Sequence, residues 1–87
     1  SVRLEEPADR AKLESPARFR WSGDCEVYLL QFSEDPEFPA GATRTAVRTD
    51  VQEVTAEGTE KYWRVVGGVT GSSSGAYTPA REVKRWR

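Results

Sequence analysis

The 87-residue chain has no histidine and a single cysteine, Cys25. Without histidine it lacks the commonest general base and the commonest metal ligand, and a Ser–His or Cys–His nucleophile pair is impossible. Cys25 cannot form an internal disulfide, and its neighbours Asp24 and Glu26 disfavour a reactive thiolate. We therefore interpret Cys25 as a small residue at a strand start. We expect no enzyme activity, no catalytic residue, no metal and no cofactor.

Long apolar runs and a strong net charge are also lacking. Since no apolar run reaches about 18 residues, we expect no membrane insertion of this segment, and no signal peptide is visible. The net charge of −1 does not favour nucleic acid. The charges are uneven, because residues 61–87 carry six basic side chains and one acid. Such a distribution suits either a docking surface or an ordinary solvated one.

The length is that of one domain, 1–87, and so small a domain has a limited core. The abrupt start at Ser1 and the end at Arg87 favour a piece excised from a longer protein. The large apolar residues identify the predicted core: Leu4, Phe19, Trp21, Tyr28, Leu30, Phe32, Phe38, Trp63, Val65, Tyr77 and Val83.

Glycine and proline interrupt every stretch that might reach helical length. The best helical stretch, Ala8–Leu13, is confined to a turn or two by Pro7 and Pro16. Strand-forming segments recur instead, with turns every 8–12 residues as in a β-sandwich. The expected strands, about seven in number, are Val2–Leu4, Arg18–Trp21, Glu26–Ser33, Thr43–Thr49, Val51–Thr55, Tyr62–Val66 and Ala76–Trp86, the last bent at Pro79.

Alternation within these strands assigns side chains to faces, because successive residues of a strand point to opposite sides. Phe19 and Trp21 share one face, as do Tyr28, Leu30 and Phe32, while Val27 and Leu29 lie opposite. In the late strand, Trp63 and Val65 share a face and Tyr62, Arg64 and Val66 take the other. Phe38, after the turn at 34–36, is expected to fold back onto the core.

The acidic group Glu34, Asp35 and Glu37 lacks the spacing and the glycine of a calcium loop, so we interpret it as a solvated turn. The segment Gly71–Gly75 is expected to be a flexible loop.

Several short motifs occur in a characteristic order: Phe19-Arg20-Trp21, then Val27 to Phe32 with Asp35-Pro36-Glu37-Phe38, then Gly58-Thr59 before Tyr62-Trp63-Arg64-Val65, then Gly75 to Val83. Together they resemble the fibronectin type III pattern in its bacterial form, over nearly the whole chain. The resemblance implies a two-sheet antiparallel β-sandwich of immunoglobulin-like, fibronectin type III topology.

Two features depart from that pattern. The family's tyrosine corner precedes the late strand, but the matching position here is Lys61, and Tyr62 points to the opposite face if the register holds. The corner is therefore absent or a bulge shifts the register. The integrin-binding tripeptide would lie in Gly71–Gly75 and is missing, so adhesion by that route is not expected.

The resemblance implies a non-catalytic module that spaces, presents or connects parts of a larger bacterial envelope or exported protein. Its partners would be neighbouring domains, and its location would be extracytoplasmic. One alternative is a carbohydrate- or peptidoglycan-binding module. Another is a protein-interaction module whose first or last edge strand pairs with a partner.

Three aromatic residues are the candidate ligand or partner contacts: Tyr62, Tyr77 and Trp86. Exposed on a sheet, such rings stack on sugars or on protein surfaces. Alternatively, Tyr62 and Tyr77 pack across strands with Arg64 over a ring. Trp86 is expected either to cover the open end of the sandwich or to contact an adjoining domain.

Overall fold

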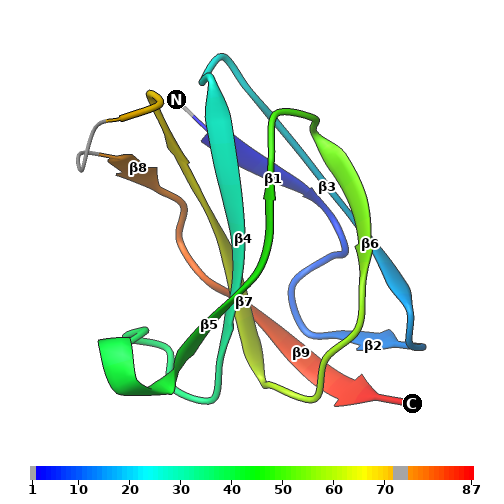
Figure 1. Cartoon of the computed structure of the whole chain (residues 1–87). Coiled ribbons are helices and arrows are strands. Elements are labelled where there is room, and N and C mark those ends of the chain that lie inside the picture. Colours follow the sequence, from blue (N-terminus) through cyan, green and yellow to red (C-terminus); the bar gives the residue numbers. More distant parts are fainter. Residues whose placement is uncertain (1, 72–74) are drawn as a thin grey trace.

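The computed structural model describes residues 2–71 and 75–87 (Figure 1). Within them the chain is all-β and forms two sheets packed together, as predicted. The elements are β1 (Val2–Glu6), β2 (Ala11–Leu13), β3 (Ala17–Gly23), β4 (Val27–Ser33), the 3₁₀ turn η1 (Ala40–Ala42), β5 (Thr43–Thr49), β6 (Glu53–Ala56), β7 (Tyr62–Gly68), β8 (Gly75–Tyr77) and β9 (Arg81–Trp86).

The smaller sheet has the strand order β1-β3-β6, and the larger sheet has the order β2-β9-β7-β4-β5, with β8 also paired to β7. The pairs are antiparallel except for β2 with β9, which are parallel. The chain therefore changes sheet between β1 and β2. Its two ends lie at opposite ends of the sandwich (Figure 1).

Two expectations about single elements were wrong. The stretch Ala8–Leu13 forms no helix: it begins with a single turn, closed by the Ala11 amide donating to the Ala8 carbonyl (3.2 Å), in which Arg10 has a φ of 64°. Ala11–Leu13 then forms β2, because it finds backbone partners on β9. The last expected strand, Ala76–Trp86, is two strands separated at residues 78–80. Part of the predicted loop Gly71–Gly75, residues 72–74, lies outside the described residues.

The break between β8 and β9 is closed by Thr78. Its amide donates to the Val65 carbonyl and its Oγ1 accepts from the Val65 amide, both at 3.1 Å. The Thr78 hydroxyl thus takes the place of a strand carbonyl just before Pro79. Since Thr78 is buried, its hydroxyl gives the Val65 amide a hydrogen-bond acceptor in the interior.

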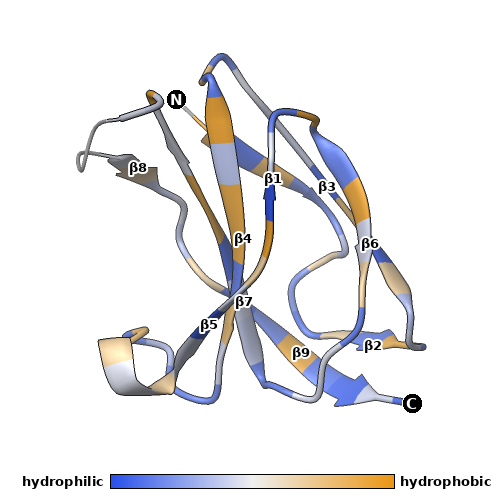
Figure 2. Cartoon of the chain, viewed as in Figure 1, coloured by the Kyte–Doolittle hydropathy of each residue, from blue (hydrophilic) through white to orange (hydrophobic). Residues whose placement is uncertain are grey.

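The core lies between the sheets and contains nine of the predicted residues. Phe19 packs edge-on against Phe32 and Trp63, with ring centroids 5.3 and 5.0 Å apart. Hydrophobic residues recur along β4 (Figure 2), and the alternation of the strand distributes them over its two faces. Those pointing inward join the core cluster of Leu4, Phe19, Trp21, Tyr28, Leu30, Phe32, Trp63, Val65 and Val83, together with Leu13 and Ala17.

Two predicted core residues lie outside this cluster, of which one is nevertheless buried. Tyr77 is 61% exposed, on β8 opposite Val66 of β7. Phe38 is buried, but outside the core cluster: it lies under the Arg64 guanidinium, 4.3 Å from ring centroid to Cζ. A backbone turn explains the position of Phe38, whose φ of 51° redirects the chain after β4.

The late strand keeps a continuous register. β7 pairs with β4 from Tyr62 opposite Ser33 to Gly68 opposite Val27 without a shift. Trp63 and Val65 therefore point into the core, whereas Tyr62, Arg64 and Val66 face outward, as expected. Lys61 is exposed. Of the two explanations for the missing tyrosine corner, the bulge is excluded and the corner is absent.

Gly67 marks a close approach of β7 to the smaller sheet. A Cβ there would lie 2.6 Å from Val2 Cγ2 and 2.7 Å from Cys25 Sγ. We expect Gly67→Ala to lower the free energy of unfolding by about 1–3 kcal/mol, because the added methyl overpacks the interior. Urea denaturation measures this. Gly41→Ala is the control, since nothing lies within 4 Å of a Cβ at that exposed position; equal stability of the two variants contradicts the prediction.

Candidate functional site

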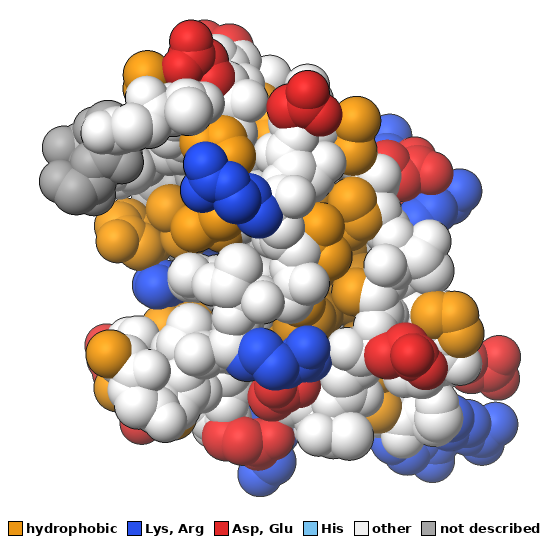
Figure 3. All heavy atoms as spheres, in the orientation of Figure 1, with side chains coloured by type: hydrophobic (Ala, Val, Ile, Leu, Met, Phe, Trp, Pro, Cys, Tyr) orange, Lys and Arg blue, Asp and Glu red, His pale blue; other side chains and the backbone are white. Residues whose placement is uncertain are grey.

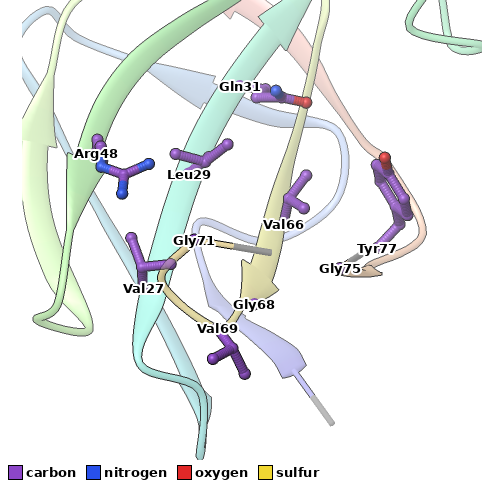
Figure 4. Close-up of a pocket in the computed structure, with 10 residues that line it drawn as sticks. All are labelled: Val27, Leu29, Gln31, Arg48, Val66, Gly68, Val69, Gly71, Gly75 and Tyr77. Atoms are coloured by element: carbon purple, nitrogen blue, oxygen red, sulfur yellow. The ribbon is translucent and has the colours of Figure 1, made fainter. Parts of the chain in front are cut away.

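The outer face of the larger sheet carries the candidate site. A shallow hollow of about 170 Å³ lies on it. Its floor is largely aliphatic, because Val27 and Leu29 of β4 and Val66 of β7 point outward there, with Gln31 of β4 beside them. Tyr77 and Val69 border it, and both are more than half exposed. Figure 4 shows these side chains around the hollow, and Figure 3 shows hydrophobic groups gathered on this side of the molecule.

Arg64 stands beside the hollow between two aromatic rings. Its Cζ lies 4.3 Å from the Phe38 ring centroid and 4.5 Å from that of Tyr77. The Arg64 Nε donates to Gln31 Oε1 at 2.9 Å, and Gln31 Nε2 in turn donates to Thr45 Oγ1 at 3.2 Å. Burial lowers the pKa of the Arg64 guanidinium, although the group stays charged at neutral pH. The stack therefore holds a partly desolvated cation in a fixed position.

A second arginine lies across the hollow from this stack. Arg48 of β5 stands opposite Leu29 and lines the hollow. Within residues 2–71 and 75–87, Arg48 and Arg64 make no ion pair, and Arg64 donates only the bond to Gln31. The site thus combines an apolar floor with two cations that are not neutralised by acids of the described chain.

The three predicted contact residues are not brought together. Tyr77 borders the hollow, and Arg64 covers one side of its ring, as the packing interpretation expected. Tyr62 shares the outer face of β7 but is only partly exposed, between Ser33 and Glu82. Trp86 lies at the end of the sandwich, with its ring centroid 5.8 Å from that of Phe32 and 6.1 Å from that of Phe19. Trp86 therefore covers the open end of the core.

Trp86 belongs to a second polar arrangement at that end. Its Nε1 donates to the Glu60 carbonyl at 2.7 Å. The Glu60 carboxylate accepts from Arg44 through Nε (2.8 Å) and Nη2 (3.1 Å), and the Arg44 guanidinium lies 5.0 Å from the Phe32 ring centroid. These contacts fix the turn between β6 and β7 over the core.

The Arg44–Glu60 pair predicts an acid-dependent loss of stability. Hydrogen bonding to Arg44 lowers the pKa of Glu60 from 4.5 to about 2, against the opposing effect of burial. A depressed folded-state pKa stabilises the fold above the unfolded-state pKa, and that stability is lost as pH falls toward the folded-state value. Because the Arg44 side chain is 47% exposed, screening reduces the contribution to about 1 kcal/mol.

We expect the stability advantage of the unmodified chain over Glu60→Gln to disappear between pH 5 and about pH 2. Denaturant unfolding at pH 6, 4 and 2.5 measures it. Glu57→Gln is the matched control, because that exposed neighbour contributes only its backbone carbonyl to Arg44. A constant difference between the unmodified chain and Glu60→Gln across this pH range contradicts the assignment.

Residues 2–71 and 75–87 contain no group of three or more His, Cys, Asp or Glu side chains placed to hold a metal ion. No helix in that part of the chain is long and apolar enough to cross a membrane.

Most of the hollow was not predicted from the sequence. Strand alternation put Val27, Leu29 and Val66 on outward faces without indicating that they meet, and Arg48 was not among the predicted site residues. A usable signal was present: an outward aliphatic pair on the strongest strand, Val27 and Leu29, needs covering or a partner. That Arg48 stands opposite Leu29 depends on a register shift between Leu30 and Gln31, which the sequence does not specify.

Comparisons with known proteins do not assign this site. No family model, curated protein or solved structure matches the chain.

Proposed function

We propose that the chain is a fibronectin type III-like module without a catalytic role, which spaces and connects larger parts of a bacterial envelope or exported protein. The observation that carries the proposal is the placement of the ends at opposite ends of a packed sandwich (Figure 1). A domain whose chain enters at one end and leaves at the other holds the parts attached to its two ends at a fixed distance from each other. Its location would be extracytoplasmic.

The strand pairing supports the finer topology in this proposal. β5 pairs with β4 and not with β6, so the sheets do not have the four-and-three division of an immunoglobulin constant domain. The residues behind the resemblance also take core positions: Trp21, Tyr28 and Trp63 are all nearly inaccessible. Where the family uses a tyrosine corner, this chain holds the turn before β7 through the Trp86 indole and the Glu60 carbonyl.

Sugar binding has less support from the arrangement of aromatic rings. Stacking would depend on Tyr77 alone, since Tyr62 is half-buried and Trp86 covers the core.

Edge-strand pairing also has limited support at the first and last strands. The last strand, β9, is covered by β2, and the first, β1, is interrupted by a register shift between Leu4 and Glu6. Shifts of this kind disfavour pairing with a further strand.

A distance measurement tests the spacer role. Donor and acceptor dyes attached at positions 2 and 87 should give one narrow distance distribution that persists until cooperative unfolding. Tryptophan fluorescence and circular dichroism should report the same transition. A broad distribution under native conditions would show that the module does not hold its ends at a fixed separation. Fractionation of cells that produce the full-length protein tests the location separately, and recovery in the cytoplasm would contradict it.

A further inference from the structure

The two outer faces of the sandwich differ in how their charges are satisfied. On the smaller sheet, Arg18 pairs with Glu6 (3.2 Å) and Glu53 (3.7 Å), and Arg20 pairs with Glu6 (3.6 Å). That face is charged and internally compensated. The larger sheet presents the aliphatic hollow, with Arg48 and Arg64 beside it. In the described part of the chain, this second face combines apolar surface with positive charge that no acid compensates.

The hollow has the volume for one anchoring group. It measures about 170 Å³, and a cavity of about 150 Å³ holds a benzene-sized molecule. Val27, Leu29 and Val66 are all partly exposed on its floor. A branched or aromatic side chain placed there would remove their apolar surface from water, at about 25 cal/mol per Å².

Arg64 is arranged to receive an acid. The two rings and Gln31 restrain its guanidinium, so little side-chain freedom remains to be lost on binding. The terminal nitrogens Nη1 and Nη2 donate no hydrogen bond to the described residues. A planar guanidinium with both terminal nitrogens available suits bidentate binding of a carboxylate.

We propose that the outer face of the larger sheet binds a short extended segment of a partner protein, with an apolar anchor in the hollow and an acidic residue two positions away on Arg64. Val66 and Arg64 are themselves two residues apart on β7, a separation of about 6.6 Å along a strand. In an extended peptide, side chains that point to the same face repeat at this same spacing. Arg48 supplies a second positive charge at the other side of the anchor.

A peptide fits this face better than a glycan does. Glycan sites present open aromatic surfaces, whereas this floor is largely aliphatic. One side of the Tyr77 ring is already occupied by Arg64. The inference concerns binding and does not depend on the spacer role, which the distance measurement tests independently.

Titration of the folded, isotope-labelled chain tests the proposal by NMR. The probe is the acetylated, amidated peptide Glu-Val-Leu-Val-Glu, compared with its charge-swapped counterpart Lys-Val-Leu-Val-Lys and with oligogalacturonate. We expect saturable shifts at Leu29, Val66, Tyr77 and the Arg64 side chain, with a dissociation constant of about 0.1–1 mM. The charge-swapped peptide should bind at least about tenfold more weakly, a difference of about 1.4 kcal/mol.

Variants separate the named contacts from general attraction. Arg64→Gln should weaken binding about tenfold, and Arg48→Gln, which alters an exposed side chain without an ion pair, should weaken it severalfold even if Arg64→Gln fails to fold. Arg18→Gln on the opposite face should leave the affinity unchanged. Absence of shifts at millimolar probe, equal binding of the two peptides, or tighter binding of oligogalacturonate at the same residues would overturn the proposal.

Discussion

Replacing Trp86 by alanine is expected to lower the free energy of unfolding by about 2–4 kcal/mol, although this residue is next to last in the chain. The indole packs on Phe19 and Phe32 at the end of the core, where its removal admits water. The Glu60 carbonyl also loses the Nε1 donor at 2.7 Å. For a domain of this size the change corresponds to a fall in Tm of about 10–20 °C.

Two further variants divide this effect into packing and hydrogen bonding. Trp86→Phe keeps an aromatic ring over the core but removes the donor, so about half of the loss should remain. Tyr77→Ala is the matched control, because that ring is 61% exposed and outside the core cluster; its cost should stay near 1 kcal/mol. Thermal unfolding of the three variants measures the differences. A Trp86→Ala effect no larger than that of Tyr77→Ala would contradict the capping role.

Replacing Arg81 by alanine is expected to lower the free energy of unfolding by about 2–4 kcal/mol, because three backbone carbonyls lose their hydrogen-bond donor. Arg81 Nη1 donates to the carbonyls of Pro7 (2.7 Å) and Glu5 (3.1 Å), and its Nη2 donates to that of Leu4 (3.0 Å). The first two of these carbonyls in the chain belong to the end of β1, and that of Pro7 begins the connection to β2. The guanidinium of β9 thus fastens the crossover between the two sheets with charge-assisted bonds.

Denaturant unfolding with two companion variants tests the role of Arg81. Arg81→Lys retains the charge but not the planar fork, so it should recover less than half of the lost stability. Arg85→Ala removes an exposed arginine from the same strand, and its effect should lie within about 0.5 kcal/mol. Equal effects of Arg81→Ala and Arg85→Ala would show that the three carbonyls are satisfied without the guanidinium.

Strand positions and their inward faces were predictable from the sequence, because the two-residue pleat is a local property of the backbone. Thr43–Thr49 was predicted to the residue, and Trp63 and Val65 were correctly assigned to the buried face of β7. The outward position of Arg64 followed from the same alternation. Core membership was predicted where a large residue stood on an inward face within a long strand.

Only the tertiary structure decided what depends on pairing between distant segments. Ala11–Leu13 becomes a strand because β9 supplies its hydrogen bonds, and Tyr77 is exposed because β8 pairs it with Val66 on the outward face of β7. The hollow exists because β4, β5, β7 and β8 meet there. The stack on Arg64 needs the ring of Phe38, from the loop after β4, and the ring of Tyr77, from β8. The sequence by itself thus determined the all-β alternation and the absence of histidine chemistry. The partner of each strand, the cover provided by Trp86 and the hollow on the larger sheet required long-range contacts that no local pattern encodes.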